Sequence, residues 1–135
     1  MIEPSSEALS PNRFLAVSRI RVPEGFDMRE FLKHTSNSQG QARRSEGNLY
    51  AKAEKDPESQ NTFWSTSLWE NETVEKEFAT SRGAHSDARR HSQDSGFEVY
   101  TATGIWSQKS TPSLKDAREF LDKKEQEELT KQSST

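Results

Sequence analysis

Three segments alternate between apolar and polar residues, which is the pattern of a β-strand with two different faces. They span residues 14–22, 47–54 and 97–106. A fourth strand is predicted over 61–69, where one face carries Phe63, Ser65, Ser67 and Trp69 and the other carries Trp64, Thr66 and Leu68. Because this strand has apolar groups on both faces, we expect both of its faces to be covered.

Helices are predicted between these strands. Residues 26–35 place Met28, Phe31, Leu32 and Thr35 at helical spacing, and the polar continuation over 36–45 is poorly defined. Asn71 can cap a second helix, which Gly83 interrupts before another run over 84–92. Thr111 and Pro112 form a helix-start signal for a C-terminal amphipathic helix.

The order of these elements is β-α-β-β-α-β with an additional C-terminal helix, which predicts an α+β, ferredoxin-like fold. We expect a flexible tail over 1–12, one folded domain over 13–106, and a linker with the C-terminal helix over 107–135. In this fold the helices cover one face of the antiparallel sheet. The other face needs cover, and we expect a second copy packed sheet to sheet, which makes the protein a homodimer.

The composition limits the size of the core and the chemistry available. Of the 135 residues, 29% are apolar, against a typical ~45–50% that also counts glycine, so one domain is expected. Without cysteine, the chain has no disulfide, thiol nucleophile or Cys-ligated metal. No signal peptide or membrane span is apparent, and with a net charge of −3 we expect a cytoplasmic protein with neither nucleic acid nor a membrane as partner.

The candidate chemistry gathers around the strand predicted over 61–69 and the helices that follow it. The residues concerned are Trp64, Ser65, Trp69, Arg82, His85, Arg89 and His91. His85 and Arg89 are four residues apart and share a helix face, where an imidazole titrating near neutral pH could accept a proton and a guanidinium could hold an anion. A solvated polar face is the plainer interpretation. For Trp64 and Trp69 the plainer interpretation is a core or dimer-interface aromatic, and the sharper one is a flat platform for a ligand.

Two segments resemble the antibiotic biosynthesis monooxygenase family, whose fold is a dimeric α/β-barrel. They are residues 14–25, and residues 62–78 together with Gly83-Ala-His85. The resemblance implies a cofactor-independent monooxygenase that acts on a small hydrophobic, aromatic substrate of phenolic, anthrone or quinol type, with molecular oxygen as co-substrate. It implies catalytic roles for His85, Arg89 and Trp69, and substrate-binding positions at Ser18, Trp64, Ser65 and Phe78. No cofactor and no metal are expected.

Two alternatives stay open on the same fold. One is a non-catalytic dimer that binds a small ligand or is associated with stress. The other is haem binding or haem degradation. The haem-degrading branch of the family uses an asparagine, a tryptophan and a histidine. Those positions fall on Ser18, Phe78 and Ala88 in this sequence, and all three residues differ from the haem-degrading pattern.

Overall fold

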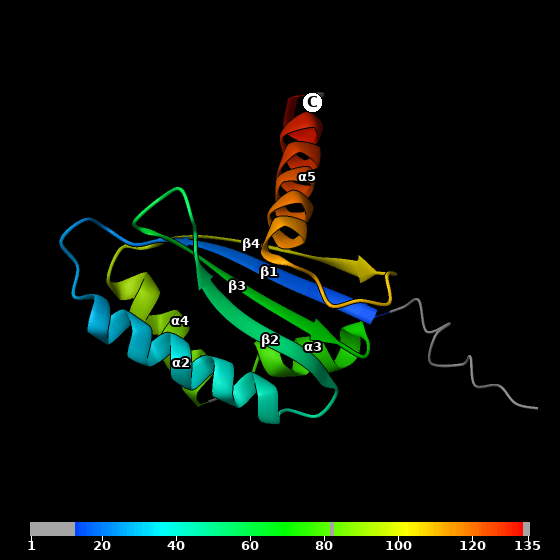
Figure 1. The fold of residues 1–135 in the computed structure, drawn as a ribbon, viewed down its shortest axis with the longest axis horizontal. Helices are drawn as coiled ribbons and strands as arrows, with labels where there is room; N and C mark the ends of the chain where they lie inside the picture. The colour runs from blue at the N-terminus through cyan, green and yellow to red at the C-terminus, as the bar shows by residue number, and fades with distance from the viewer. Residues whose placement is uncertain (1–12, 82, 134–135) are drawn as a thin grey trace, which may run out of the picture.

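The computed structural model describes residues 13–81 and 83–133. Its strands are β1 (Arg13–Arg21), β2 (Asn48–Lys55), β3 (Thr62–Trp69) and β4 (Glu98–Trp106), and its helices are α2 (Met28–Arg44), α3 (Glu72–Ala79), α4 (Ala84–Asp94) and α5 (Leu114–Ser133). The strands form one antiparallel sheet in the order β2-β3-β1-β4 (Figure 1). The predicted ferredoxin-like α+β fold with an extra C-terminal helix is therefore confirmed. The expected tail over 1–12 lies outside the described residues.

Two helix boundaries differ from those predicted. The helix expected over 26–35 begins at Met28, after the cap Asp27, and continues to Arg44. Its polar second half is helical because Gln39 and Ala42 are buried on the same face as Phe31. At the other end of the chain, α5 begins at Leu114 rather than at Pro112.

A reciprocal pair of hydrogen bonds caps the first turn of helix α5. The Asp116 amide donates to the Ser113 hydroxyl over 3.1 Å, and the Ser113 amide donates to the Asp116 carboxylate over 3.0 Å. This capping box supplies partners for backbone groups that have none inside the helix. Ser113, and not Thr111, is the capping residue.

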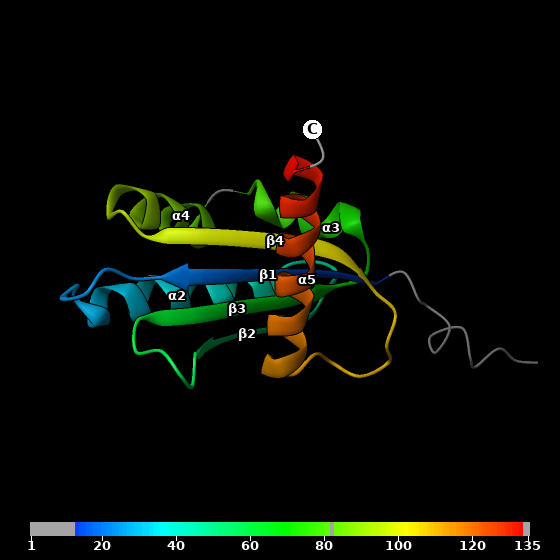
Figure 2. The same ribbon diagram turned by 90° about the horizontal axis from the view of Figure 1, so that it is seen from above.

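One face of the sheet is covered by α5, which runs across the strands (Figures 1 and 2). One of the three clusters of buried apolar side chains lies here: Leu15, Val17, Trp64, Leu68, Ala102, Trp106, Ala117 and Leu121. Farther along the helix, Glu125 accepts two hydrogen bonds from Arg19, at 3.1 and 3.0 Å. This is the face that was expected to need a second copy. The homodimer stays a prediction. The argument for it assumed an uncovered face of the sheet, and α5 covers part of that face.

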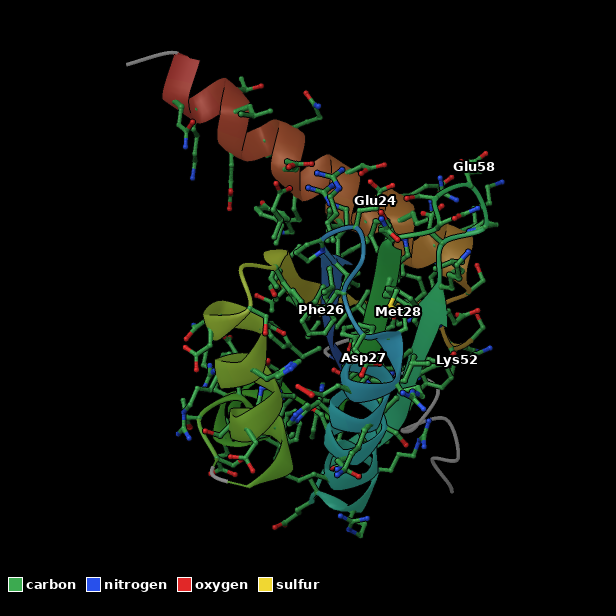
Figure 3. The ribbon with its side chains drawn as sticks, turned by 90° about the vertical axis from the view of Figure 1, so that its left-hand side faces the viewer. Glu24, Phe26, Asp27, Met28, Lys52 and Glu58 are labelled. Atoms are coloured by element: carbon green, nitrogen blue, oxygen red, sulfur yellow. The ribbon has the colours of Figure 1, made fainter. Side chains whose placement is uncertain are left out.

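The other face is covered by α2, α3 and α4. Two aromatic clusters hold these helices to opposite ends of the sheet: one contains Phe14, Trp69 and Phe78, and the other contains Phe31, Phe63 and Phe97. Figure 3 views the end of the sheet that holds the cluster of Phe31, Phe63 and Phe97. Phe26, Asp27 and Met28 are labelled there at the start of α2, and α5 lies on the opposite side of the sheet from α2. Among the described residues, no helix is both long and apolar enough to cross a membrane.

We expect Leu121→Ala to lower the free energy of unfolding by about 2–5 kcal/mol, because the side chain is fully buried between α5 and the sheet. Leu129→Ala is the matched control on the same helix. Leu129 is 50% exposed, so its replacement should change stability by less than ~0.5 kcal/mol. Urea unfolding followed by circular dichroism measures both. Equal effects of the two substitutions would mean that α5 does not pack on the sheet.

Candidate functional site

A cavity of about 560 Å³ lies between the sheet and the three helices α2, α3 and α4. Its volume is within the ~300–1,000 Å³ range that is usual for small-molecule sites. Small side chains form its floor: Ala16 and Ser18 from β1, Ser65 and Ser67 from β3, and Thr101 from β4. The cavity exists because these side chains are too short to fill the space beneath the helices.

Three floor residues place hydroxyl groups in one row across neighbouring strands. Ser18 is paired with Ser65 on β3 and with Thr101 on β4. The Ser18 and Thr101 hydroxyls are 2.7 Å apart and hydrogen-bonded, and Ser65 accepts a hydrogen bond of 2.9 Å from the Gln39 side-chain amide. The floor can therefore exchange hydrogen bonds with a polar group on a bound molecule.

Gln39 leaves an unused acceptor beside this floor. Its side-chain oxygen, Oε1, is buried and has no hydrogen-bond partner among the described residues. A buried acceptor without a partner costs about 1–3 kcal/mol, so it is expected to find a donor. Gln39 lines the cavity, but Oε1 itself is not exposed to it, so a bound molecule could reach this acceptor only after the side chain turns.

Helix α4 is positioned against α2 by Gln41. Gly83 precedes α4 with a positive φ of 107° and offers no side-chain cap. The Gln41 side-chain oxygen accepts a hydrogen bond of 2.7 Å from the His85 amide, and its side-chain nitrogen donates to the Ser81 hydroxyl over 2.9 Å. A side chain of α2 thus caps α4 and brings His85 to the cavity wall.

The His85 imidazole is held on both sides. Its Nδ1 and the Ser38 hydroxyl are 3.1 Å apart, and its ring lies 4.4 Å from that of Phe78. Burial, together with the positive charge of Arg89, lowers the pKa of His85 to about 4. The sequence predicted an imidazole that titrates near neutral pH. Instead, His85 is neutral throughout the physiological range.

The predicted site residues divide into three groups. Ser18, Ser65, Phe78, His85 and Arg89 all line the cavity. Trp69 lies on the same side of the sheet but is fully buried behind Phe78, with its ring 5.1 Å from the Phe78 ring and its indole N–H donating to Ser67. It can therefore position Phe78 and Ser67 but does not line the cavity.

Trp64 is separated from the other predicted site residues by the sheet. It packs under α5, and its indole N–H donates to Asp56 over 2.8 Å. Its position does not allow it to serve as a platform for a ligand in this cavity. Arg82 lies outside the described residues.

The sequence interpretation missed many of the lining residues, among them Ser38, Gln39 and Glu75. Burial raises the pKa of the Glu75 carboxyl, which is only 7% exposed. Gln39 follows Phe31 by eight residues and so returns to the same helix face, but this spacing becomes a signal only if the helix is known to extend beyond Thr35. The burial of Glu75 had no such signal, because Glu72 and Glu77 on the same helix are exposed.

No protein-family model and no curated protein matches the sequence. Solved structures do match. A protein from Nitrosomonas europaea, provisionally described as an antibiotic biosynthesis monooxygenase, aligns with 76% of this chain and 96% of its own at a TM-score of 0.64 and 11% identity. A similarly described protein from Deinococcus radiodurans gives 0.61 at 13% identity, covering 74% of this chain and 98% of that one.

SnoaB from Streptomyces nogalater, described as a cofactor-independent oxygenase, matches with a TM-score of 0.56 and 15% identity, over 74% of this chain and 96% of its own. This is the antibiotic biosynthesis monooxygenase fold. At these identities the likeness shows the fold alone, and about a quarter of this chain lies outside each alignment.

Ser18, Phe78 and Ala88, the positions that the resemblance assigned to the haem alternative, all line the cavity. The alanine side chain has no atom that can ligate iron, so Ala88 cannot serve as the iron ligand.

We expect His85 to make stability depend on pH. A folded-state pKa of about 4, below the ordinary 6.5, means that stability is fully present above pH 6.5 and is lost as the pH falls toward 4. The difference between the two pKa values corresponds to a loss of at most about 3 kcal/mol in the free energy of unfolding. Urea unfolding between pH 7.5 and 4 should therefore show a steeper loss for the wild type than for His85→Gln. Parallel curves for the two proteins would contradict the burial of a neutral imidazole.

Proposed function

We propose that this protein binds a small planar aromatic compound with an ionisable hydroxyl group in the cavity and oxidises it with molecular oxygen, without a cofactor. The observation that carries the proposal is the shared wall of the cavity, where the His85 ring packs on the ring of Phe78 and Arg89 lines the same space. A proton acceptor, a cation and an aromatic surface are the three features that an aromatic anion requires.

The binding step uses shape and hydrogen bonds. The Phe78 ring offers one flat surface, and the aromatic clusters at the two ends of the sheet limit the length of the space. A hydroxyl of the substrate could donate to the Ser18 or Thr101 hydroxyl, and a carbonyl could accept from either of them. A compound that lacks polar groups would use neither of these hydroxyls, so polar aromatics are favoured over hydrocarbons.

The chemical step begins with loss of a proton. We assign the accepting role to His85 Nε2, in the tautomer in which Nδ1–H donates to the Ser38 hydroxyl. The positive charge of Arg89 stabilises the substrate anion and lowers the pKa of its hydroxyl. The electron-rich anion then gives one electron to oxygen, and the substrate radical and superoxide combine to a peroxide anion at a carbon that bears a hydrogen. The proton held by His85 returns to this anion and completes the hydroperoxide. Loss of water leaves a new carbonyl, so one oxygen atom enters the product and the other leaves as water.

A second candidate function is binding without turnover. The pKa of about 4 for His85 favours it, because an imidazole that resists protonation is a weak base. In that case the same wall would recognise an aromatic anion mainly through Arg89. The protein would then be a carrier or sensor of such compounds rather than an oxygenase.

Arg89→Gln and Arg90→Gln form a matched pair for testing the binding step. Both arginines are exposed residues of α4, but only Arg89 lines the cavity. With 1,8-dihydroxyanthrone as the probe, we expect Arg89→Gln to weaken binding about 10–100-fold, the range of a hydrogen bond to a charged group. Arg90→Gln should bind as the wild type does. Equal affinities of the two variants, measured by fluorescence titration, would contradict an anion site at Arg89.

The two candidate functions are separated by oxygen consumption with the same probe. An oxygenase should take up one oxygen molecule per anthraquinone formed, and His85→Ala should slow this turnover by roughly 10²–10⁴-fold. Binding without any oxygen uptake above the uncatalysed rate supports the carrier. Turnover that is unchanged in His85→Ala would exclude His85 as the base.

A further inference from the structure

Three side chains that could ligate a metal ion meet at the rim of the cavity. Glu30 and His34 lie one turn apart on α2, and His91 comes from the last turn of α4. Figure 1 shows the beginning of α2 beside the end of α4. His34 and His91 also line the cavity, whereas the Glu30 side chain is 54% exposed. The cluster therefore connects the cavity with solvent.

The distances within the cluster suit a common ligand. One ligand atom from each of the three residues lies within 4.8 Å of the others. The His91 Nε2 and Glu30 Oε1 atoms are 2.8 Å apart, and the rings of His34 and His91 are stacked with their centres 4.2 Å apart. An imidazole nitrogen ligates in the plane of its ring, so the His34 ring must tilt away from the His91 ring for both to reach one ion.

Packing holds the His91 ring in place. Phe26 and Phe97 contact it edge to face, with ring centres 5.5 and 5.7 Å from its own, and only 14% of its side chain is exposed. Phe26, labelled in Figure 3, comes from the segment just before α2. An imidazole that is already fixed loses little rotational freedom on binding an ion, which favours a preformed site.

We propose that Glu30, His34 and His91 bind one divalent transition-metal ion of the Zn²⁺ class at the rim of the cavity. Two imidazoles and one carboxylate suit Zn²⁺ and its first-row neighbours, whereas Mg²⁺ and Ca²⁺ prefer oxygen ligands alone. The ion takes the place of a proton between His91 Nε2 and Glu30 Oε1, with His34 as the third ligand. Its remaining coordination position is open to water or to a molecule in the cavity.

This site is independent of the function proposed above, since neither His85 nor Arg89 belongs to the cluster. The simpler occupant of the same geometry is a proton, which would make Glu30 and protonated His91 an ordinary ion pair. An ion pair needs no His34 and binds no metal. The two possibilities therefore differ in a quantity that can be measured directly.

The test is calorimetric titration of the untagged full chain with Zn²⁺ at pH 7.5. We expect one ion per chain. Glu30→Gln, His34→Ala and His91→Ala should each weaken the affinity by at least the ~10–100-fold that is typical of disturbing a metal ligand. His85→Ala is the matched control, because His85 is the remaining histidine of the chain and also lines the cavity. It should bind Zn²⁺ as tightly as the wild type.

Co²⁺ and Mg²⁺ provide a second readout. Co²⁺ should give visible absorption bands that disappear in Glu30→Gln, a change at an exposed position that should leave the fold intact. Mg²⁺ should neither bind nor compete. The proposal is overturned if Zn²⁺ does not bind, if the three variants bind it as the wild type does, if His85→Ala loses affinity to the same extent, or if Mg²⁺ competes equally well.

Discussion

In the middle of the sheet the two faces carry side chains of different size, and the rest of the structure depends on this difference. On β1 the large residues Leu15 and Val17 point toward α5, and the small residues Ala16 and Ser18 point toward the other helices. The same division continues on β3, with Trp64 and Leu68 on one side and Ser65 and Ser67 on the other. A chain with 29% apolar residues can fill one face completely, and here it fills the face under α5.

The helix-side face is closed at its ends and open in its middle. The aromatic clusters around Trp69 and around Phe31 hold α2, α3 and α4 at a distance that the short floor residues cannot bridge. What remains is a cavity lined by polar residues: the floor hydroxyls, Gln39, the buried carboxyl of Glu75 and the neutral imidazole of His85. The packing that limits the stability of this face is therefore also what makes it a binding site.

Much of the fold could be predicted from the sequence, because alternation along 14–22 and 97–106 and the Asn71 cap are local signals. The length of α2 was not predictable in this way. Its second half lacks an apolar stripe, and its burial depends on the contacts of Gln39 and Ala42 with other elements. The position of α5 likewise depends on tertiary contacts, since nothing in its own sequence tells which face of the sheet it covers.

The candidate site was predictable in part. The four-residue spacing of His85 and Arg89 correctly indicated a shared surface, and both line the cavity. The pKa of His85 was not predictable, because it depends on burial against Phe78 and α2 rather than on neighbours in sequence. Trp64 and Trp69 show the same limit: their type suggests a ligand platform, but their indole N–H groups are already bonded to Asp56 and Ser67.

The most direct test of open space between the sheet and the helices is the stability of Ala16→Leu. Ala16 lies in the floor, opposite Ser67 and Thr103 on the neighbouring strands. If the cavity is open, the larger side chain enters it and the free energy of unfolding is unchanged or increased. If the helices instead close on the floor, the added atoms overpack the core, and a loss of about 1–3 kcal/mol would contradict the account.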